Sequence, residues 1–241
     1  MIRHGGKKKY VNSSRVHLRE QVRRFSRGTK KGMLVLDAGA GKSPYRGLFK
    51  HARYEACDFA QLSTGYAPLD YVCDITDIPV EDGRFDRVVF NQVMEHLPEP
   101  DKALAELHRV LKPGGRIFCS VPLFYEEHQK PYDYFRYTQF ALRKLFEDAG
   151  FRVVRIEWLE GYFGTVSHQF HQMYRWLPHN VREVRALGLG WRGLRVLPVL
   201  LLTRLLAGRL RAFYSELDVA SKQTDRGMPK NYVVVAVKPV D

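Results

Sequence analysis

Cysteine and long hydrophobic runs are both scarce in this sequence of 241 residues. The three cysteines, Cys57, Cys73 and Cys119, are too few for a disulfide scaffold, and none has the C-x-x-C or histidine spacing of a metal site. We interpret them as buried reduced thiols, which favours a cytoplasmic compartment. The longest uncharged apolar stretch near the C-terminus, residues 196–203, has eight residues, whereas a membrane span needs about 20.

The sequence also shows no pattern of a secretory signal, and its acidic residues are fewer than its basic ones. The basic residues 1–9 are followed by no apolar segment, so we expect neither a signal peptide nor a transmembrane span. Lys and Arg number 39 against 26 Asp and Glu, a formal net charge of +13. Because 45% of the residues are hydrophobic, disorder is excluded as the main state. The length fits one large domain, or one domain with an elaboration.

The excess positive charge is concentrated in two segments. Residues 1–31 hold 11 Lys or Arg and one acid, and residues 175–211 hold eight Arg and one acid. The rest of the chain carries a net charge of −4. Two basic flanks on a mildly acidic core suit a polyanion, either nucleic acid or an anionic membrane surface. The alternative is a solvated tail with surface arginines.

Short apolar runs alternate with segments of helical periodicity along most of the chain. This alternation predicts an α/β fold in which helices cover both faces of a doubly wound, mostly parallel, seven-stranded sheet. Strands are expected near residues 33–37, 54–59, 71–74, 85–91, 116–122, 151–158 and 231–238, and helices near 14–27, 43–50, 101–111 and 138–149. About 70 residues separate the last two strands, which is long enough for a helical subdomain.

The sharpest motif is a strand that delivers an acid to a glycine turn, Val-Leu-Asp-Ala-Gly-Ala-Gly at residues 35–41. Glycines at alternate positions let the backbone approach a ligand. The dinucleotide pattern G-x-G-x-x-G fails because its third glycine position is Pro44. The P-loop pattern fails because its first glycine position is Leu36.

What remains, D-x-G-x-G at a strand end, resembles class I S-adenosylmethionine-dependent methyltransferases of the type 11 group over residues 33–151. The resemblance implies a Rossmann-like sheet with an antiparallel last strand. It implies S-adenosylmethionine as cofactor and S-adenosylhomocysteine as product. In the family, the turn that contains Gly39 and Gly41 lies against the methionine part of the cofactor, and Asp37 orders the site. Lys42 stands where the family has a third glycine.

Further cofactor residues follow at the ends of later strands. Asp58 ends the second strand, where a carboxylate can accept both ribose hydroxyls of a nucleoside. The resemblance implies that Asp74 binds the adenine amino group and that Ile75 packs on the ring. Asn91 and Gln92 end the fourth strand, where open α/β sheets bind ligands, and we expect a backbone carbonyl there to face the cofactor. The sequence Glu-His-Leu at residues 95–97 resembles a common loop of the family, with a cofactor-side or a structural role for its histidine.

A long polar and aromatic loop, residues 121–138, follows the fifth strand. Its pattern H-x-x-P-x-D-x-x-R-Y-T resembles a subset of the family associated with glycan or lipid-linked polymer pathways. Transfer to a hydroxyl requires alignment and removal of its proton, and His128 is the best candidate base because its ordinary pKa lies near neutrality. Asp133 would orient that imidazole or take the proton itself. Arg136 would hold an anionic substrate group or pair with Asp133.

Two alternatives for this loop are a purely structural role and substrate binding without proton transfer. We expect no metal site, because no cluster of ligands with metal spacing is present in the sequence. His168 and His171 lack an obvious carboxylate partner and are interpreted as core or surface residues.

The segment 187–215 is both apolar and basic. On a helix over about 199–217, Arg204, Gly208, Arg211 and Ser215 share one face, and leucines and Phe213 fill much of the rest. A wide apolar face with arginines is typical of an interfacial helix, so this segment and the N-terminal tail are candidates for contact with an anionic membrane. The alternative is a helical cap that buries its leucines against the fold or in a homodimer, and contact with nucleic acid is less favoured.

Together these patterns divide the chain into four parts. They are a basic tail and N-terminal helix (1–31), an S-adenosylmethionine-binding methyltransferase core (32–160), a basic and apolar helical insertion (161–229) and a final core strand (230–241). We expect an enzyme that methylates an oxygen of a small-molecule, lipid or lipid-linked glycan acceptor. Its expected location is cytoplasmic or peripheral on the inner membrane face.

Two other functions are weighed against this one. An RNA methyltransferase would use the basic flanks, but the motif of N6-adenine enzymes is absent, since residues 91–94 read Asn-Gln-Val-Met. A non-catalytic S-adenosylmethionine-binding scaffold would have no need of the intact acids and glycines, so their presence argues against it.

Overall fold

The computed structural model describes residues 10–60, 65–188 and 190–240, without the side chains of residues 190 and 191. The first nine residues of the expected basic tail therefore lie outside the described residues, as does the side chain of Trp191. Contacts divide the chain into two units. Residues 18–159 and 229–241 form the first, here named the sheet unit, and residues 160–228 with those up to His17 form the second, named the helical unit.

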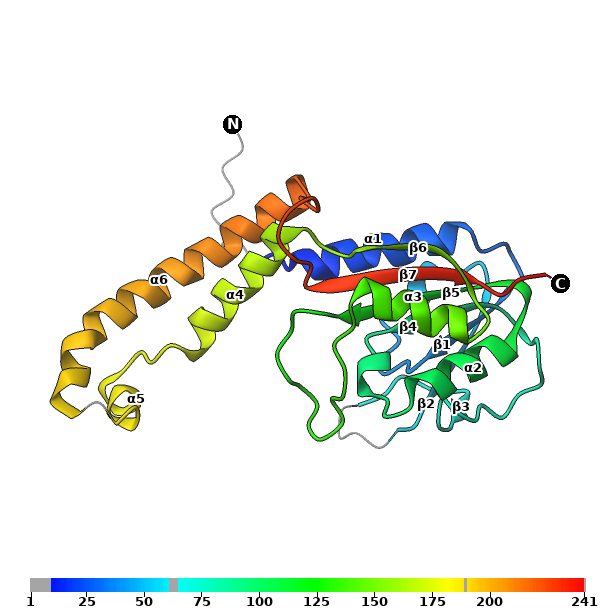
Figure 1. Cartoon of the computed structure of the whole chain (residues 1–241), viewed down its shortest axis with the longest axis horizontal. Helices are drawn as coiled ribbons and strands as arrows, with labels where there is room; N and C mark the ends of the chain where they lie inside the picture. The colour runs from blue at the N-terminus through cyan, green and yellow to red at the C-terminus, as the bar shows by residue number, and fades with distance from the viewer. Residues whose placement is uncertain (1–9, 61–64, 189, 241) are drawn as a thin grey trace. The chain divides into compact units, whose positions relative to one another are not determined.

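The described residues form one seven-stranded sheet, in the order β3-β2-β1-β4-β5-β7-β6 (Figure 1). The first five strands pair in parallel, whereas β7 runs antiparallel between β5 and β6. The expected fold class is therefore confirmed. The strands are β1 (Leu34–Ala38), β2 (Arg53–Asp58), β3 (Tyr71–Val72), β4 (Phe85–Asn91), β5 (Leu111–Pro122), β6 (Arg152–Trp158) and β7 (Asn231–Val237).

Two hydrophobic clusters cover the two faces of this sheet, because successive residues of a strand point to opposite sides. Helix α1 (Ser13–Arg27) sends Leu18, Val22 and Phe25 onto one face. Helices α2 (Pro100–Val110) and α3 (Gln139–Asp148) cover the other. Burying each such side chain contributes on the order of 2 kcal/mol, so the clusters hold the strand ends at fixed positions.

The turn after β1 departs from the expected secondary structure. The helix expected over residues 43–50 is wrong in extent, since only a short 3-10 turn, η1 (Arg46–Leu48), forms there. Ser43 has a positive φ of 44°, and Pro44 follows it. A left-handed residue cannot lie inside a right-handed helix, so the helix cannot begin until Pro44 has been passed.

The helical unit contains α4 (Tyr162–Trp176), α5 (Val181–Ala186) and α6 (Gly190–Ala220). Helix α6 begins earlier than expected and continues through Pro198. It lies close to α4 at Gly208, where an added Cβ would sit 2.9 Å from the Tyr174 ring. No described helix is long and apolar enough to cross a membrane.

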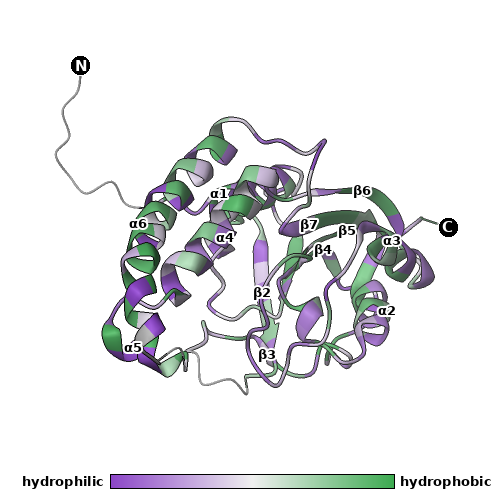
Figure 2. Cartoon of the chain, turned by 60° about the vertical axis from the view of Figure 1, so that its left-hand side comes forward, coloured by the Kyte–Doolittle hydropathy of each residue, from purple (hydrophilic) through white to green (hydrophobic). Residues whose placement is uncertain are grey.

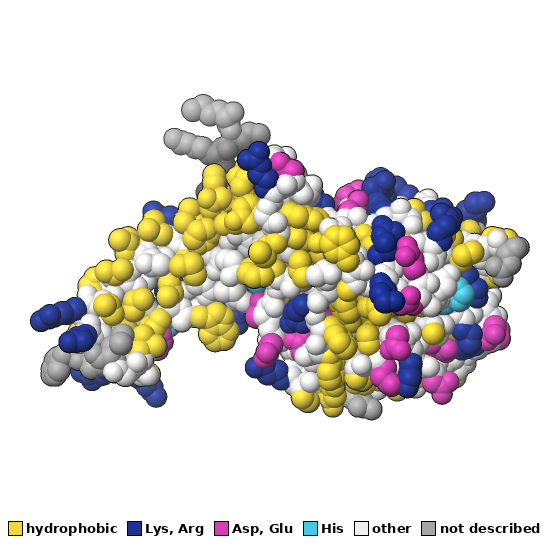
Figure 3. All heavy atoms as spheres, viewed as in Figure 1, with side chains coloured by type: hydrophobic (Ala, Val, Ile, Leu, Met, Phe, Trp, Pro, Cys, Tyr) yellow, Lys and Arg dark blue, Asp and Glu magenta, His cyan; other side chains and the backbone are white. Residues whose placement is uncertain are grey.

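Helix α6 packs its polar face inside the helical unit and exposes its apolar face (Figures 2 and 3). The guanidinium groups of Arg204 and Arg211 lie 4.7 and 4.0 Å from the centre of the Tyr174 ring. Ser215 Oγ donates to the Val11 carbonyl at 2.6 Å. The outward side chains are 43–63% exposed and comprise Val199, Leu201, Leu202, Leu205, Leu206 and Phe213. Within the helical unit, these leucines are therefore not buried.

This arrangement predicts that, on α6, removal of an inward arginine side chain lowers stability more than removal of an exposed leucine side chain. Arg211→Ala removes contacts with two aromatic rings, at 4.0 and 5.0 Å, and should lower the free energy of unfolding by about 2 kcal/mol. The matched control Leu206→Ala, at a side chain 46% exposed, should change it by less than about 0.5 kcal/mol. Urea unfolding measures both, and a larger cost for Leu206→Ala would contradict the orientation of α6.

Candidate functional site

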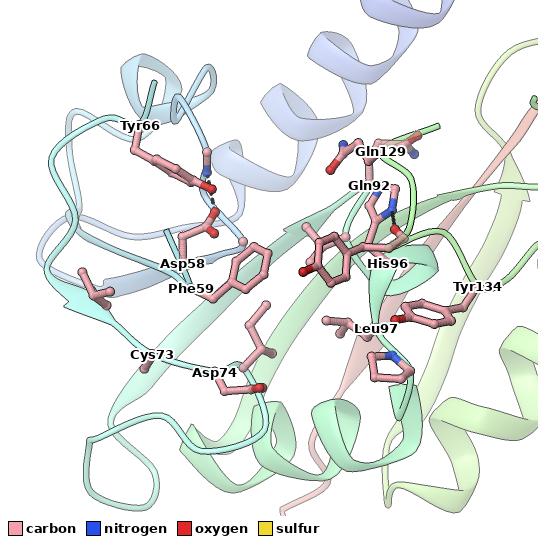
Figure 4. Close-up of a pocket in the computed structure, with 17 residues that line it drawn as sticks. Asp58, Phe59, Tyr66, Cys73, Asp74, Gln92, His96, Leu97, Gln129 and Tyr134 are labelled. Carbon is pink, nitrogen blue, oxygen red and sulfur yellow. Dashed lines mark hydrogen bonds between the residues drawn. The ribbon is translucent and has the colours of Figure 1, made fainter. Parts of the chain in front are cut away.

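A cavity of about 680 Å³ opens at the carboxyl ends of the parallel strands in the sheet unit (Figure 4). In the sheet, β1 lies between β2 and β4, so the strand order reverses direction at this point. The crevice at such a reversal is the usual ligand position of doubly wound sheets. Its wall combines the turns after β1 to β4 with the loop after β5. The polar and aromatic lining residues are Asp58, Phe59, Tyr66, Cys73, Asp74, Gln92, His96, Gln129, Tyr132 and Tyr134.

The glycine turn after β1 passes so close to Val93, two residues beyond β4, that a side chain has no room. Gly39 has a φ of 72°, and an added Cβ would lie 2.4 Å from Cγ2 of Val93. Its N–H donates to the Cys57 carbonyl at 2.9 Å, which ties the turn to β2. Gly41 is also left-handed, with a φ of 49°. Both glycines line the cavity.

Asp58 is held at the cavity wall by this turn. Its Oδ2 accepts a hydrogen bond from the Gly41 N–H at 2.9 Å, and its Oδ1 makes only a long contact of 3.4 Å with the Ala60 N–H. The side chain is almost buried, yet it lines the cavity. The carboxylate is thus fixed in orientation while one oxygen keeps capacity to accept hydrogen bonds from a ligand.

Asp74 and Ile75 form the wall beyond β3. Oδ1 of Asp74 accepts from the backbone N–H and the hydroxyl of Thr76, at 2.9 and 2.8 Å. This local turn fixes the carboxylate, whose second oxygen can accept from a ligand. Ile75 is 6% exposed and supplies an apolar surface on the cavity side. Cys73, expected to be buried, is half-buried and also lines the cavity.

Two of the expected cofactor residues lie behind the wall. Asp37 is buried and accepts a hydrogen bond from the Tyr54 hydroxyl at 2.7 Å. Burial raises the pKa of Asp37 to about 6. Asn91 Oδ1 accepts from the Ser120 hydroxyl at 3.2 Å. Neither side chain lines the cavity, so any effect on a ligand would pass through neighbouring groups.

Gln92 differs from its neighbour because its backbone is left-handed, with a φ of 54°. Its N–H donates to the Ser120 carbonyl at 2.8 Å, and its side-chain amide donates to the Ser120 hydroxyl at 3.2 Å. The unusual φ ends the strand and turns the side chain to the cavity (Figure 4).

Asp133 and Arg136 form a closed clamp in the loop after β5. The guanidinium donates to both Asp133 oxygens at 2.8 Å, and its other N–H groups donate to the carbonyls of Tyr125, Glu126 and Phe135. All five N–H donors of Arg136 are therefore used within the loop. Hydrogen bonds from Arg136 hold the pKa of Asp133 well below its usual range, so the carboxylate stays ionised and engaged within the loop. The geometry favours loop pairing over substrate binding for Arg136.

His128 does not line the cavity, contrary to the expectation for a catalytic base. Its backbone N–H donates to Asp133 at 2.7 Å, and its ring lies 4.7 Å from the ring of His96, edge to face. The cavity-lining histidine is His96. Its Nδ1 donates to the Tyr132 carbonyl, which leaves Nε2 with the basic lone pair.

Next to His96 lies Glu95, whose side chain is fully buried without a hydrogen-bond partner for either oxygen. Burial raises the pKa of Glu95 to about 8, and burial lowers that of His96. Glu95 lies in the Glu-His-Leu segment that resembles the family's loop, but it was not among the expected site residues. The sequence feature that could have identified Glu95 is the position of this short motif directly after β4, at the ligand-binding edge of the sheet.

Part of this chain is similar in sequence to known proteins. Residues 36–119 match a family described as "Methyltransferase domain". Demethylmenaquinone methyltransferase of Clavibacter sepedonicus is 39% identical over 94 residues, which cover 35% of this chain and 38% of that protein. The tRNA (carboxymethyluridine(34)-5-O)-methyltransferase of Macaca fascicularis is 28% identical over 113 residues, 44% of this chain and 17% of that protein.

A solved structure agrees in fold. Phosphoethanolamine N-methyltransferase 2 of Haemonchus contortus, in complex with S-adenosyl-L-methionine, matches with a TM-score of 0.55 at 14% identity. The match covers 92% of this chain and 52% of that one. The sheet unit is a class I S-adenosylmethionine-dependent methyltransferase domain. The chain spans well under half the length of the two curated relatives, 38% and 17%.

The cavity of this methyltransferase domain fits its cofactor. Asp58 would offer a fixed carboxylate to the ribose hydroxyls, and the bare backbone at Gly39 and Gly41 would face the methionine part. Asp74 would supply an acceptor and Ile75 an apolar surface for the adenine. When bound, S-adenosylmethionine supplies an electrophilic methyl group.

The ribose assignment predicts a specific loss. Asp58→Asn should weaken binding of S-adenosylhomocysteine at least 10-fold, because an amide cannot accept two hydroxyls and the Gly41 N–H together. The matched control is Asp77→Asn, at an exposed acid outside the cavity, which should bind normally. Isothermal titration calorimetry measures both affinities, and equal affinity for the two variants would contradict the assignment.

Proposed function

We propose that this protein methylates an oxygen of a small-molecule or lipid-linked acceptor at an anionic membrane surface. The observation that carries the transfer chemistry is the continuity of the cavity from Asp58 to His96. Asp58 belongs to the cofactor end. His96 and Tyr134 belong to the other end, where an acceptor would lie beside the donor methyl group, and the ring of Tyr132 reaches from there to Phe59 at 6.3 Å.

The acceptor end has the features that an oxygen nucleophile requires. A hydroxyl must be aligned and must lose its proton as it attacks. Two tyrosines and Gln129 offer an apolar wall with hydrogen-bonding tips. The imidazole at this end is that of His96 rather than that of His128. Its Nδ1 donates to the Tyr132 carbonyl and its Nε2 is buried beside Glu95, so the proton of the hydroxyl would pass to solvent. Oxygen is also the methylated atom in the name of the tRNA-modifying relative.

The membrane part of the proposal rests on a strip of α6, named the exposed strip. Positions four and three apart place its members on one side of the helix. They are Arg195, Val199, Leu202, Leu206, Arg209 and Phe213, all exposed. Each apolar side chain buried in lipid would contribute about 1.5–3 kcal/mol, and each arginine about 1 kcal/mol near anionic headgroups.

Charge complementarity favours a membrane over a second copy as the partner of this strip. Residues 175–211 carry eight arginines and one acid, so two copies facing each other would repel. Anionic lipid would be attracted instead. Trp176, which is 72% exposed, adds an aromatic side chain of the kind that favours the headgroup region. The proposed location is therefore peripheral, on the cytoplasmic face.

The acceptor class can be read from label transfer. Purified protein, extract and methyl-labelled S-adenosylmethionine should yield label in the organic-solvent fraction. Asp58→Asn should reduce this label at least 10-fold, in proportion to its loss of cofactor binding. Label in RNA would overturn the proposal and assign the basic flanks to phosphate contacts instead.

The exposed strip predicts vesicle binding. The protein should sediment with vesicles of phosphatidylglycerol and phosphatidylcholine but not with phosphatidylcholine alone. Leu202→Gln with Leu206→Gln should abolish sedimentation without loss of stability, since both side chains are about half exposed. Phe140→Gln, at a 76% exposed residue on α3, is the matched control and should bind normally.

Two outcomes would contradict this docking. Absence of wild-type sedimentation would remove the membrane proposal. A wild-type dimer in analytical ultracentrifugation that becomes monomeric in the double variant would assign the strip to a second copy of the chain.

A further inference from the structure

Three side chains with metal-ligating atoms meet beside the cavity of the methyltransferase domain. Glu95 and His96 come from the 3-10 turn η2 (Met94–His96) after β4, and His128 comes from the loop after β5. One potential ligand atom from each lies within 4.8 Å of the other two. Glu95 Oε1 and His96 Nε2 are already 3.8 Å apart.

Three polar atoms of this cluster are buried without any hydrogen-bond partner. They are both carboxylate oxygens of Glu95 and Nε2 of His96. Each buried, unpaired polar atom costs about 1–3 kcal/mol, and more if it belongs to a charged group. Folded proteins leave few such atoms, so three at one place call for a ligand that satisfies them together.

The opposite nitrogens of the two imidazoles are already engaged. His96 Nδ1 donates to the Tyr132 carbonyl. His128 Nδ1 contacts the Glu126 carbonyl at 3.1 Å and Oδ2 of Asp133 at 3.4 Å. In each ring this leaves Nε2 as the lone-pair nitrogen. Metal-binding histidines characteristically donate their other N–H to a carbonyl or carboxylate in this way, which fixes the tautomer and the ring orientation.

We propose that Glu95, His96 and His128 form a binding site for a divalent transition-metal ion, with Zn²⁺ the best fit. Two imidazole nitrogens and one carboxylate are the protein ligands of many catalytic zinc sites, which keep a further position open. Mg²⁺ is disfavoured because it prefers oxygen donors. This site revises the expectation of no metal, because the chain brings Glu95 and His128 together only on folding.

The charges around the cluster are compatible with a cation. Arg136 lies near Glu95, but its charge is compensated by the bidentate pair with Asp133. The net charge facing a bound ion is then that of the Glu95 carboxylate. Ligand bonds of about 2.0–2.2 Å require the donors to draw closer than they are now. His128 is half-buried on a loop, so it has room to move inward.

The site would change how the acceptor is activated. His96 lines the cavity but its Nε2 is buried, so a cation there would act on the acceptor through its open coordination position. At that position it would lower the pKa of a coordinated hydroxyl, whose proton passes to solvent. This catalytic use rests on the proposed function. Metal binding itself does not depend on it.

The test measures metal binding directly. Full-length protein is stripped with a chelator, and Zn²⁺ is titrated in competition with a chromophoric chelator. One equivalent should bind, and Co²⁺ should give the visible absorption of a low-coordinate site. Glu95→Gln and His128→Gln should each weaken Zn²⁺ binding at least 100-fold. His179→Gln is the matched control, because His179 pairs with Glu183 at 3.0 Å on the surface of the helical unit.

Three results would overturn the site. They are no Zn²⁺ binding by the wild type, equal binding by the wild type and Glu95→Gln, or binding of Mg²⁺ in preference to Zn²⁺. Circular dichroism checks that the variants fold. Calorimetric binding of S-adenosylhomocysteine and label transfer by the wild type are read separately, so failure of the metal site is distinguishable from failure of the proposed function.

Discussion

The close approach of Gly39 to Val93 is the constraint on which the cofactor side of the cavity depends. Strands β1 and β4 are neighbours in the sheet, and the turn that leaves β1 packs against the side chain of Val93, which follows β4. Only a residue without a Cβ fits there in a left-handed conformation. The turn then presents the Gly41 N–H to Asp58, which fixes the carboxylate at the wall. A larger residue at position 39 would displace the turn and the acid together.

The second organising interaction is the Asp133–Arg136 clamp. Arg136 uses every N–H within the loop after β5, so the loop holds a defined shape although it has no regular secondary structure. That shape brings the Tyr132 carbonyl to His96 and places His128 against the same ring. The clamp thus acts on the chemistry indirectly, by orienting imidazoles. From the sequence, Arg136 was expected either to hold an anionic substrate group or to pair with Asp133, and the structure has the pair.

Sequence reasoning located the strand ends well and the side-chain directions less well. Strand β4 spans the seven expected residues, and Gly39, Gly41, Asp58, Asp74, Ile75 and Gln92 all line the cavity. Asp37 and Asn91 are at strand ends too, but they point behind the wall. Whether a residue at a strand end faces a ligand depends on its φ and on its hydrogen bonds. Gln92 is an example, because its left-handed backbone directs its side chain to the cavity. Asn91 instead accepts a hydrogen bond from the Ser120 hydroxyl.

The sequence by itself determined the α/β class, the doubly wound sheet and the ligand-binding edge, because these follow from local periodicity and from turn residues. Tertiary structure decided which face of α6 packs and which histidine reaches the cavity. Helical spacing groups Arg204 and Arg211 on one face, but only Tyr174 on another helix makes that the inner face. Likewise, Glu95 and His128 are 33 positions apart and meet only through folding. Contacts between distant segments leave no periodic trace in a single sequence, so the structure alone reveals them.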